Sequence, residues 1–103
     1  MHQSNAKIID TMREIIFLLR VCSEKRWSRI LNVFLFECYN TKNEDQVIKK
    51  IINIYQGGMG SFNDLVLHKD RKMLMDENEK LEKLRRDLYI ACENFLKTNP
   101  KQN

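Results

Sequence analysis

The chain has 103 residues, of which 43% are hydrophobic and 31% are charged, and its formal net charge is +4. This length predicts one domain with one modest hydrophobic core. The positive excess is divided evenly, +2 in residues 1–40 and +2 in residues 41–103, and most basic residues stand close to acidic ones. Such a distribution argues against a nucleic-acid-binding face, which gathers unpaired positive charge in one place.

Cysteine usage and hydropathy indicate where the protein works. The three cysteines, Cys22, Cys38 and Cys92, are far apart and each falls among apolar residues. An odd and sparse set is typical of buried reduced thiols rather than of a disulfide scaffold. The apolar run IIFLLRVC from Ile15 is much shorter than the ~20 residues that cross a bilayer, so it predicts a core helix. With no signal peptide visible, we expect a cytoplasmic protein that does not enter a membrane.

The first 40 residues predict two amphipathic helices. Residues 5–22 carry apolar side chains at the spacing of one helical face: Ile8, Met12, Ile15, Leu19 and Cys22. Ser23 is expected to cap a second helix over residues 24–40. Its apolar stripe comprises Trp27, Ile30, Leu31, Phe34, Leu35 and Cys38. Because Val33, Phe36 and Tyr39 add apolar surface outside that stripe, this helix is either central in the fold or partly covered by a partner.

Two further helices are predicted. Asn43 and Gln46 have the spacing of a capping box for a helix over residues 44–56, whose stripe comprises Val47, Ile48, Ile51, Ile54 and Tyr55. A long helix over residues 71–97 has a stripe of Leu74, Leu81, Leu84, Leu88, Ala91 and Phe95, with a polar gap near Glu77 and Asn78. The expected fold class is therefore all-α: a four-helix, bundle-like single domain over residues 1–97, followed by a polar C-terminal tail over residues 98–103.

A glycine-rich loop precedes the long helix and contains every glycine of the chain, Gly57, Gly58 and Gly60. A Walker-type phosphate loop would place a Lys-Ser/Thr pair after the last glycine, and a dinucleotide-binding loop would follow a strand; neither condition is met. We therefore expect a structural loop, in which Gly57 ends the preceding helix with a positive φ and Gly58 and Gly60 permit a sharp reversal. Ser61 would start the next turn, with Asp64 as its capping carboxylate.

The same loop provides the candidate partner-binding residues, since loops carry binding residues more often than helices do. Met59 and Phe62 are expected to be exposed, beside polar groups from Ser61, Asn63, Asp64 and His68. Asp64 and His68 are four residues apart and would share a helical face, where they could hold a metal or act as an acid–base pair. The other histidine, His2, is near the N-terminus and no cysteine is close, so a surface pair is the preferred interpretation. We expect no catalytic residue, no metal and no cofactor.

The stretch GGMGSFNDLVL, Gly57 to Leu67, follows the isoleucine-rich segment Ile51–Tyr55. Together they resemble the motif of a family of small uncharacterised bacterial helical proteins. Such proteins resemble the immunity partners that are encoded beside contact-dependent or secreted bacterial toxins. The resemblance implies a protein that binds and neutralises a cognate toxin domain, and it supplies no catalytic residues. Because this chain is basic, its toxin is expected not to be strongly basic, unless shape and apolar contact dominate the interface.

Two alternatives stay open. A stand-alone helical interaction module or a homodimer would use the same apolar surplus without any toxin. An enzyme ranks third, because His68 has no second acid at a useful spacing. The residues by themselves thus predict a small helical binding protein, and the resemblance alone names its partner.

Overall fold

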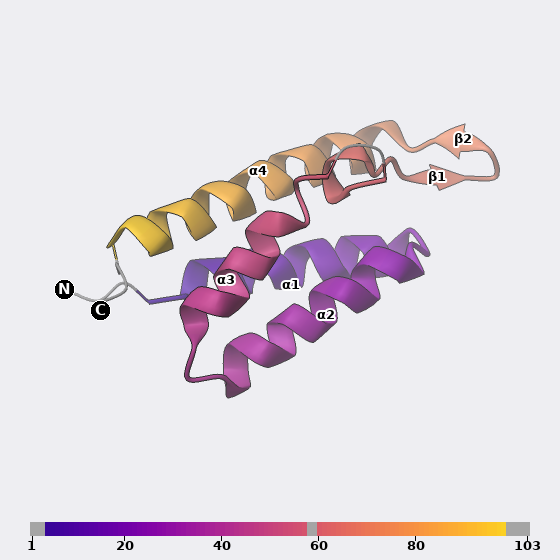
Figure 1. Ribbon diagram of the computed structural model, residues 1–103. Helices are drawn as coiled ribbons and strands as arrows, with labels where there is room; N and C mark the ends of the chain where they lie inside the picture. Colours follow the sequence, from indigo (N-terminus) through magenta and orange to yellow (C-terminus); the bar gives the residue numbers. More distant parts are fainter. Residues whose placement is uncertain (1–3, 58–59, 99–103) are drawn as a thin grey trace.

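The computed structural model describes residues 4–57 and 60–98 and consists mainly of α-helix (Figure 1). The helices are α1 (Ala6–Val21), α2 (Lys25–Asn40), α3 (Glu44–Asn53) and α4 (Met75–Thr98). Between α3 and α4 lie a short 3-10 helix, η1 (Phe62–Asp64), and an antiparallel hairpin of β1 (His68–Lys69) and β2 (Lys72–Met73). The predicted helical class is confirmed, and the hairpin is an addition to it.

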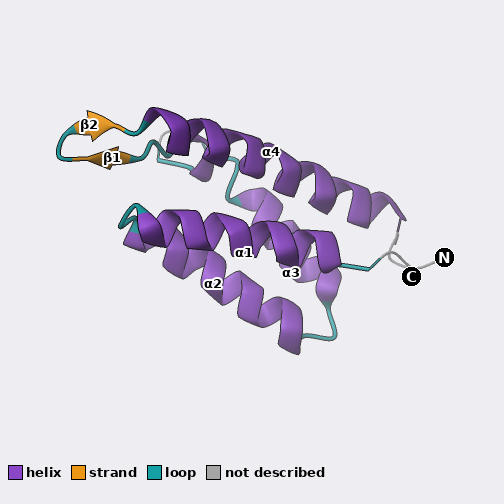
Figure 2. Ribbon diagram, turned by 180° about the vertical axis from the view of Figure 1, so that it is seen from behind, coloured by secondary structure: helices purple, strands orange, loops and turns teal. Residues whose placement is uncertain are grey.

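The four helices enclose one core. Both α1 and α3 pack against α2 and α4. The described part of the chain is elongated, with extents of 50 × 24 × 20 Å. Figure 2 shows that the start of α1 and the end of α4 lie at one end of the molecule, whereas the hairpin lies at the other.

The core is formed by the apolar stripes that the sequence predicts. On α1, Ile8, Met12, Ile15 and Leu19 are buried, and Cys22 just after the helix is half-buried. The buried apolar residues of the other elements are Trp27, Leu31, Cys38, Val47, Ile48, Ile51, Tyr55, Phe62, Leu67, Leu81, Leu84, Leu88, Cys92 and Phe95. Because every helix contributes, each apolar face is covered by side chains from at least two neighbours.

The predicted capping interactions are absent at two helix starts, although Asn43 is the N-cap residue of α3 as predicted. Ser23 does not cap α2: it has a φ of +60° in the turn after α1, so the next residue takes the capping position. There, Glu24 Oε2 accepts a hydrogen bond from the Trp27 N–H at 2.6 Å. Asn43 stands at the start of α3, but its side chain makes no capping bond. Its own N–H donates to Thr41 Oγ1 at 3.0 Å, which holds the linker rather than the helix.

Two helix boundaries also differ from those predicted around the glycine-rich loop. The third helix ends at Asn53 rather than at residue 56, and the chain passes through a turn at Ile54 and Tyr55. The long helix begins at Met75 rather than at residue 71, because Asp70 and Arg71 have φ values of +53° and +68° that no α-helix accommodates. It continues to Thr98, the first residue of the predicted tail; residues 99–103 lie outside the described part.

The cysteines are all free, as predicted, but they are not equally buried. Cys38 and Cys92 are buried and Cys22 is half-buried. Burial raises the pKa of Cys38 to about 11 and that of Cys92 to about 12, since an apolar surrounding disfavours the thiolate. None of the helices in the described ranges is both long and apolar enough to cross a membrane.

Candidate functional site

Three hydrogen bonds tie the glycine-rich loop to itself and to the end of α3. The Phe62 N–H donates to the Ile54 carbonyl oxygen at 3.0 Å, and Asn63 Nδ2 donates to the Tyr55 carbonyl oxygen at 2.9 Å. Asp64 Oδ2 accepts from the Gly60 N–H at 3.0 Å. The loop is therefore closed at its base, and the Asn-Asp pair of the motif serves this closure.

Gly57 and Gly60 have φ values of +103° and +85°, in the region that favours glycine. The positive φ predicted for Gly57 is confirmed, but its predicted place at the helix end is wrong, because Ile54 is the C-cap of α3. A Cβ built on either glycine would meet no atom within 4 Å. Backbone conformation, rather than a lack of space, therefore requires glycine here. Gly58 and Met59 lie outside the described residues.

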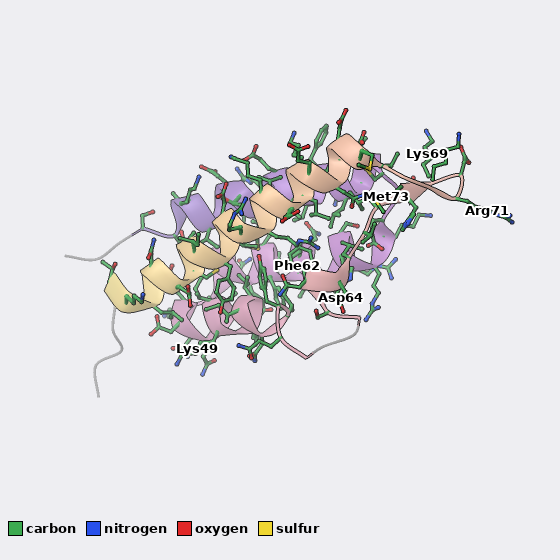
Figure 3. All side chains as sticks on the ribbon, turned by 90° about the horizontal axis from the view of Figure 1, so that it is seen from above. Lys49, Phe62, Asp64, Lys69, Arg71 and Met73 are labelled. Atoms are coloured by element: carbon green, nitrogen blue, oxygen red, sulfur yellow. The ribbon has the colours of Figure 1, made fainter. Side chains whose placement is uncertain are left out.

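Phe62 is buried, with 0% of its side chain exposed, so the expected exposure of this residue is wrong. Its ring centroid lies 5.2 Å from that of Trp27 and 5.3 Å from that of Tyr55, and the Tyr55 ring meets it edge-on. Figure 3 shows Phe62 among the helices. The physical reason is the bond from its own N–H to Ile54, which fixes the turn so that the side chain enters the core. A substitution of Phe62 would therefore act first on folding.

Arg85 of α4 secures η1 from the other side. Its Nη1 donates to the carbonyl oxygens of Phe62 at 2.8 Å and Leu65 at 3.0 Å, and its guanidinium lies 5.8 Å from the centroid of the Phe62 ring. Tyr55 completes the arrangement by donating from its hydroxyl to the Arg85 carbonyl oxygen at 2.6 Å. Burial lowers the pKa of Arg85 and raises that of Tyr55. This role was not predicted from the sequence, because Arg85 lies within the charged run of residues 76–87, which is typical of a solvated helix face.

Asp64 and His68 do not share a helical face, contrary to the prediction. Asp64 ends η1, and His68 begins β1 after an extended segment at Leu65. The Asp64 carboxylate is bonded to Gly60. Ser61 precedes η1 without a capping bond from its hydroxyl. The structure thus places His68 on a different element from Ser61, Asn63 and Asp64. Partner binding through these four residues stays a prediction.

A shallow hollow of about 600 Å³ lies between the glycine-rich loop and α4. Its lining includes Asn63, Glu82, Arg85 and Arg86. Arg85 Nη1 donates hydrogen bonds to two carbonyl oxygens, those of Phe62 and Leu65. Glu82 adds a negative charge to the same lining as Arg86. The hollow therefore presents no uniform charge to a small ligand.

The most unusual exposed surface lies across α1 and α2. Phe17 on α1 is 70% exposed and Phe36 on α2 is 66% exposed, and Tyr39 is also exposed. We call the surface formed by Phe17, Phe36, Tyr39, Arg13 and Arg20 the α1–α2 face. The excess apolar surface predicted on the second helix is therefore present. The exposure of Phe17 was not predicted, because Phe17 lies on the side of α1 opposite its apolar stripe.

Two arginines make the α1–α2 face both apolar and basic. Arg13 donates from Nη2 to the Tyr39 hydroxyl, and its guanidinium lies 5.5 Å from the centroid of that ring. Arg13, Phe17 and Arg20 line one shallow groove of about 200 Å³, together with Asn32 and Leu35 of α2. The side chains from the two helices thus form one continuous surface.

A second exposed surface lies at the hairpin. Val66, Met73 and Met75 are exposed there, next to the charged turn from Lys69 to Lys72. Figure 3 shows Lys69 and Arg71 extending beyond the helices, with Met73 closer to them. Among the described residues, no group of three or more His, Cys, Asp or Glu side chains is arranged to hold a metal ion.

One family of proteins matches a large part of this chain. No curated protein and no solved structure matches this chain. Residues 20–75, more than half of the chain, match the model of a domain of unknown function, DUF6966. The matched segment runs from the end of α1 to the first residue of α4, so it includes α2, the glycine-rich loop and the hairpin. The chain therefore belongs to the DUF6966 family.

Proposed function

We propose that this protein is a cytoplasmic immunity protein, which binds and neutralises a cognate toxin domain through the α1–α2 face. The observation that carries the proposal is the exposure of Phe17 and Phe36 on adjacent helices. Large aromatic side chains in water cost free energy that a partner recovers by covering them, and they are typical anchors of protein interfaces. The sequence resemblance is the reason for proposing a toxin as the partner. We further infer that the four helices act as one bundle-like body, which presents the α1–α2 face.

The charge of the face favours a different protein over a second copy of this chain. Helices α1 and α2 together carry six basic and three acidic residues, a net of +3, whereas α4 carries five basic and six acidic residues, a net of −1. In a symmetric dimer built on this face, a surface that carries Arg13 and Arg20 would pack against a second surface of the same positive charge. A partner with carboxylates around an apolar centre would instead complement them.

The proposal is tested by co-expression. The C-terminal domain encoded by the neighbouring gene is produced in a laboratory strain with and without this protein. We expect the domain alone to arrest growth, the protein to restore growth, and the two to elute as one complex. The double variant Phe17→Ser/Phe36→Ser should lose both protection and the complex. Its matched control is Ile90→Ser, which changes an exposed apolar residue on α4.

Each outcome has a separate meaning. Urea unfolding of each variant shows first that the fold is intact, since substitutions of exposed residues usually change stability by no more than about 0.5 kcal/mol. Equal protection by the double variant would remove the α1–α2 face from the interface. A protein that neither protects nor binds the neighbouring domain is not its immunity protein. A dimer on sizing that the double variant breaks would support the homodimer instead.

A further inference from the structure

The hairpin is an unusual feature in an otherwise helical protein. β1 pairs with β2 through His68 opposite Met73 and Lys69 opposite Lys72, and all four residues are exposed. The Leu74 N–H donates to the Leu67 carbonyl oxygen at 3.0 Å, which extends the pairing towards the core. Figure 1 shows the hairpin projecting past the ends of the helices. A two-stranded hairpin has little stability of its own, so the helices must hold it at its base.

The strand alternation gives the hairpin two different faces. Leu67 and Leu74 point to one face at the base, where Leu67 is buried, and Lys69 and Lys72 follow on the same face beyond the core. The opposite face carries the exposed side chains of His68 and Met73, and Val66 and Met75 are exposed beside the base of the hairpin. The hairpin therefore has a basic face and an apolar face.

Two features of the tip cost stability, and no ion pair among the described residues offsets them. Asp70 and Arg71 both have positive φ, as a tight two-residue turn requires. Aspartate tolerates this conformation, but the Cβ of arginine does not fit it well. Lys69 and Lys72 face each other directly, and like charges across a strand pair repel. In the described ranges the ion pairs are Lys50–Glu37 and Lys83–Asp87, and neither involves the hairpin.

The hairpin lies near the turn that joins α1 to α2. Burial and Glu77 raise the pKa of the Cys22 thiol in this turn, and the charge of Lys69 lowers it. Cys22 and Glu24 also line a hollow together with His68. Arg20 of the α1–α2 face lies two residues before Cys22, so a partner on that face that extends past the turn would meet the hairpin.

We propose that the hairpin is an electrostatic docking element, which binds a carboxylate-rich patch on the same partner protein that covers the α1–α2 face. This inference rests on the proposed function, because it assigns the same partner to the hairpin and to the α1–α2 face. Carboxylates between Lys69 and Lys72 would turn their repulsion into attraction.

A protein fits this surface better than a nucleic acid does. The tip carries three cations, Lys69, Arg71 and Lys72, which form no ion pair within residues 4–57 and 60–98, and it also carries Asp70. A nucleic acid is bound by a longer track of cations that follows its phosphates, usually with aromatic rings on which bases stack. No phenylalanine, tyrosine or tryptophan occurs from Leu65 to Leu88, so the imidazole of His68 is the one aromatic ring in the hairpin sequence. A compact group of carboxylates matches the small size of the tip.

The test measures binding without the toxin. The probe is a labelled synthetic peptide in which glutamate pairs alternate with leucine, titrated with the full-length protein at low and at physiological salt. Lys69→Glu/Lys72→Glu is compared with Lys80→Glu/Lys83→Glu on α4. Both double variants change the net charge by the same amount, so a nonspecific charge effect would weaken peptide binding to the same extent in each. We expect the hairpin variant to bind about tenfold more weakly than wild type, with a smaller salt dependence, and the α4 variant to bind nearly as wild type does.

The outcomes separate this inference from the proposed function. Equal losses in the two variants, or no binding of the peptide at all, would overturn the role of the hairpin even if the protein protects against its toxin. Tighter binding to single-stranded DNA of matched length, or to vesicles that contain phosphatidylserine, would also overturn it. If the peptide binds through the hairpin but the neighbouring domain neither arrests growth nor binds, only the naming of the partner fails.

Discussion

Asn78 holds the backbone of Leu67 with both ends of its side-chain amide. Its Oδ1 accepts from the Leu67 N–H at 2.7 Å, and its Nδ2 donates to the Leu67 carbonyl oxygen at 2.9 Å. The same Nδ2 donates to the Leu74 carbonyl oxygen at 2.8 Å. The Asn78 side chain, in the first turn of α4, thus supplies the hydrogen bonds that a neighbouring strand would give to the base of the hairpin. The polar gap in the stripe of the long helix is explained by this role.

Replacing Asn78 is expected to destabilise the protein strongly. Asn78→Ala leaves the N–H of the buried Leu67 without its partner and leaves its carbonyl oxygen with the Leu74 N–H alone, which should lower the free energy of unfolding by about 2 kcal/mol. Urea unfolding measures the change. Asn94→Ala, at an exposed position on the same helix, is the control and should change the free energy by less than about 0.5 kcal/mol. Equal stability of the two variants would show that the amide does not support the hairpin.

Arg85 and Arg86 are neighbours in sequence with different roles, which allows a matched comparison. Arg85→Met removes the donor to the Phe62 and Leu65 carbonyl oxygens and the charge near the Phe62 ring, so it should cost about 2 kcal/mol. Arg86→Met changes an exposed residue and should cost little. Thermal unfolding followed by Trp27 fluorescence is the measurement, because Trp27 contacts Phe62. A similar melting temperature for both variants would contradict the role given to Arg85.

The apolar stripes were predictable because they depend on helical spacing alone. Ile8, Met12, Ile15 and Leu19 recur at the period of one helical face, and all four are buried. The position of Phe62 was not predictable in this way, because its burial depends on a hydrogen bond across the loop and on Trp27, distant in sequence. The hairpin gave no signal either, since its turn residues are Asp70 and Arg71 instead of the asparagine and glycine that usually mark a tight turn.

The positive φ of Gly57 leads to a prediction about side-chain branching. Gly57→Val should lower the free energy of unfolding by more than about 1 kcal/mol, because a β-branched residue tolerates a φ of +103° poorly. Gln56→Val introduces the same side chain at the preceding exposed position, whose φ is not positive, and should have a small effect. Urea unfolding distinguishes the two. An unchanged midpoint for Gly57→Val would show that the loop accepts another backbone conformation.

Glycine at position 71 should stabilise the protein. Arg71→Gly relieves a left-handed conformation that costs an ordinary residue about 1–2 kcal/mol, part of which is offset by the greater freedom of glycine in the unfolded chain. The net gain is expected to be about 0.5–1 kcal/mol, measured as a higher melting temperature. Lys72→Gly, in the paired strand, is the control and should destabilise. A lower melting temperature for Arg71→Gly would contradict the strain assigned to the turn.

The buried Cys38 thiol is expected to make stability fall at alkaline pH. Its pKa is raised by burial from 9.0 to about 11, so the folded state holds this proton more tightly than the unfolded state does. The stabilising contribution is fully present below pH 9 and is lost as the pH rises towards 11. Unfolding of the wild type and of Cys38→Ala is measured across this window, and the variant should show the smaller decline. Cys22→Ala, at a half-buried position, is the comparison and should decline much as the wild type does.

The start of α1 and the end of α4 lie side by side, away from the hairpin (Figure 2). A dye or a surface linker attached beside Ala6 or Thr98 is therefore at the end opposite the hairpin, in a described part 50 Å long. The protein can be immobilised through either position with its hairpin end directed into solution. Joining the start of α1 to the end of α4 by a peptide and opening the chain between α2 and α3 would give a circular permutant with the hairpin and its supports unbroken.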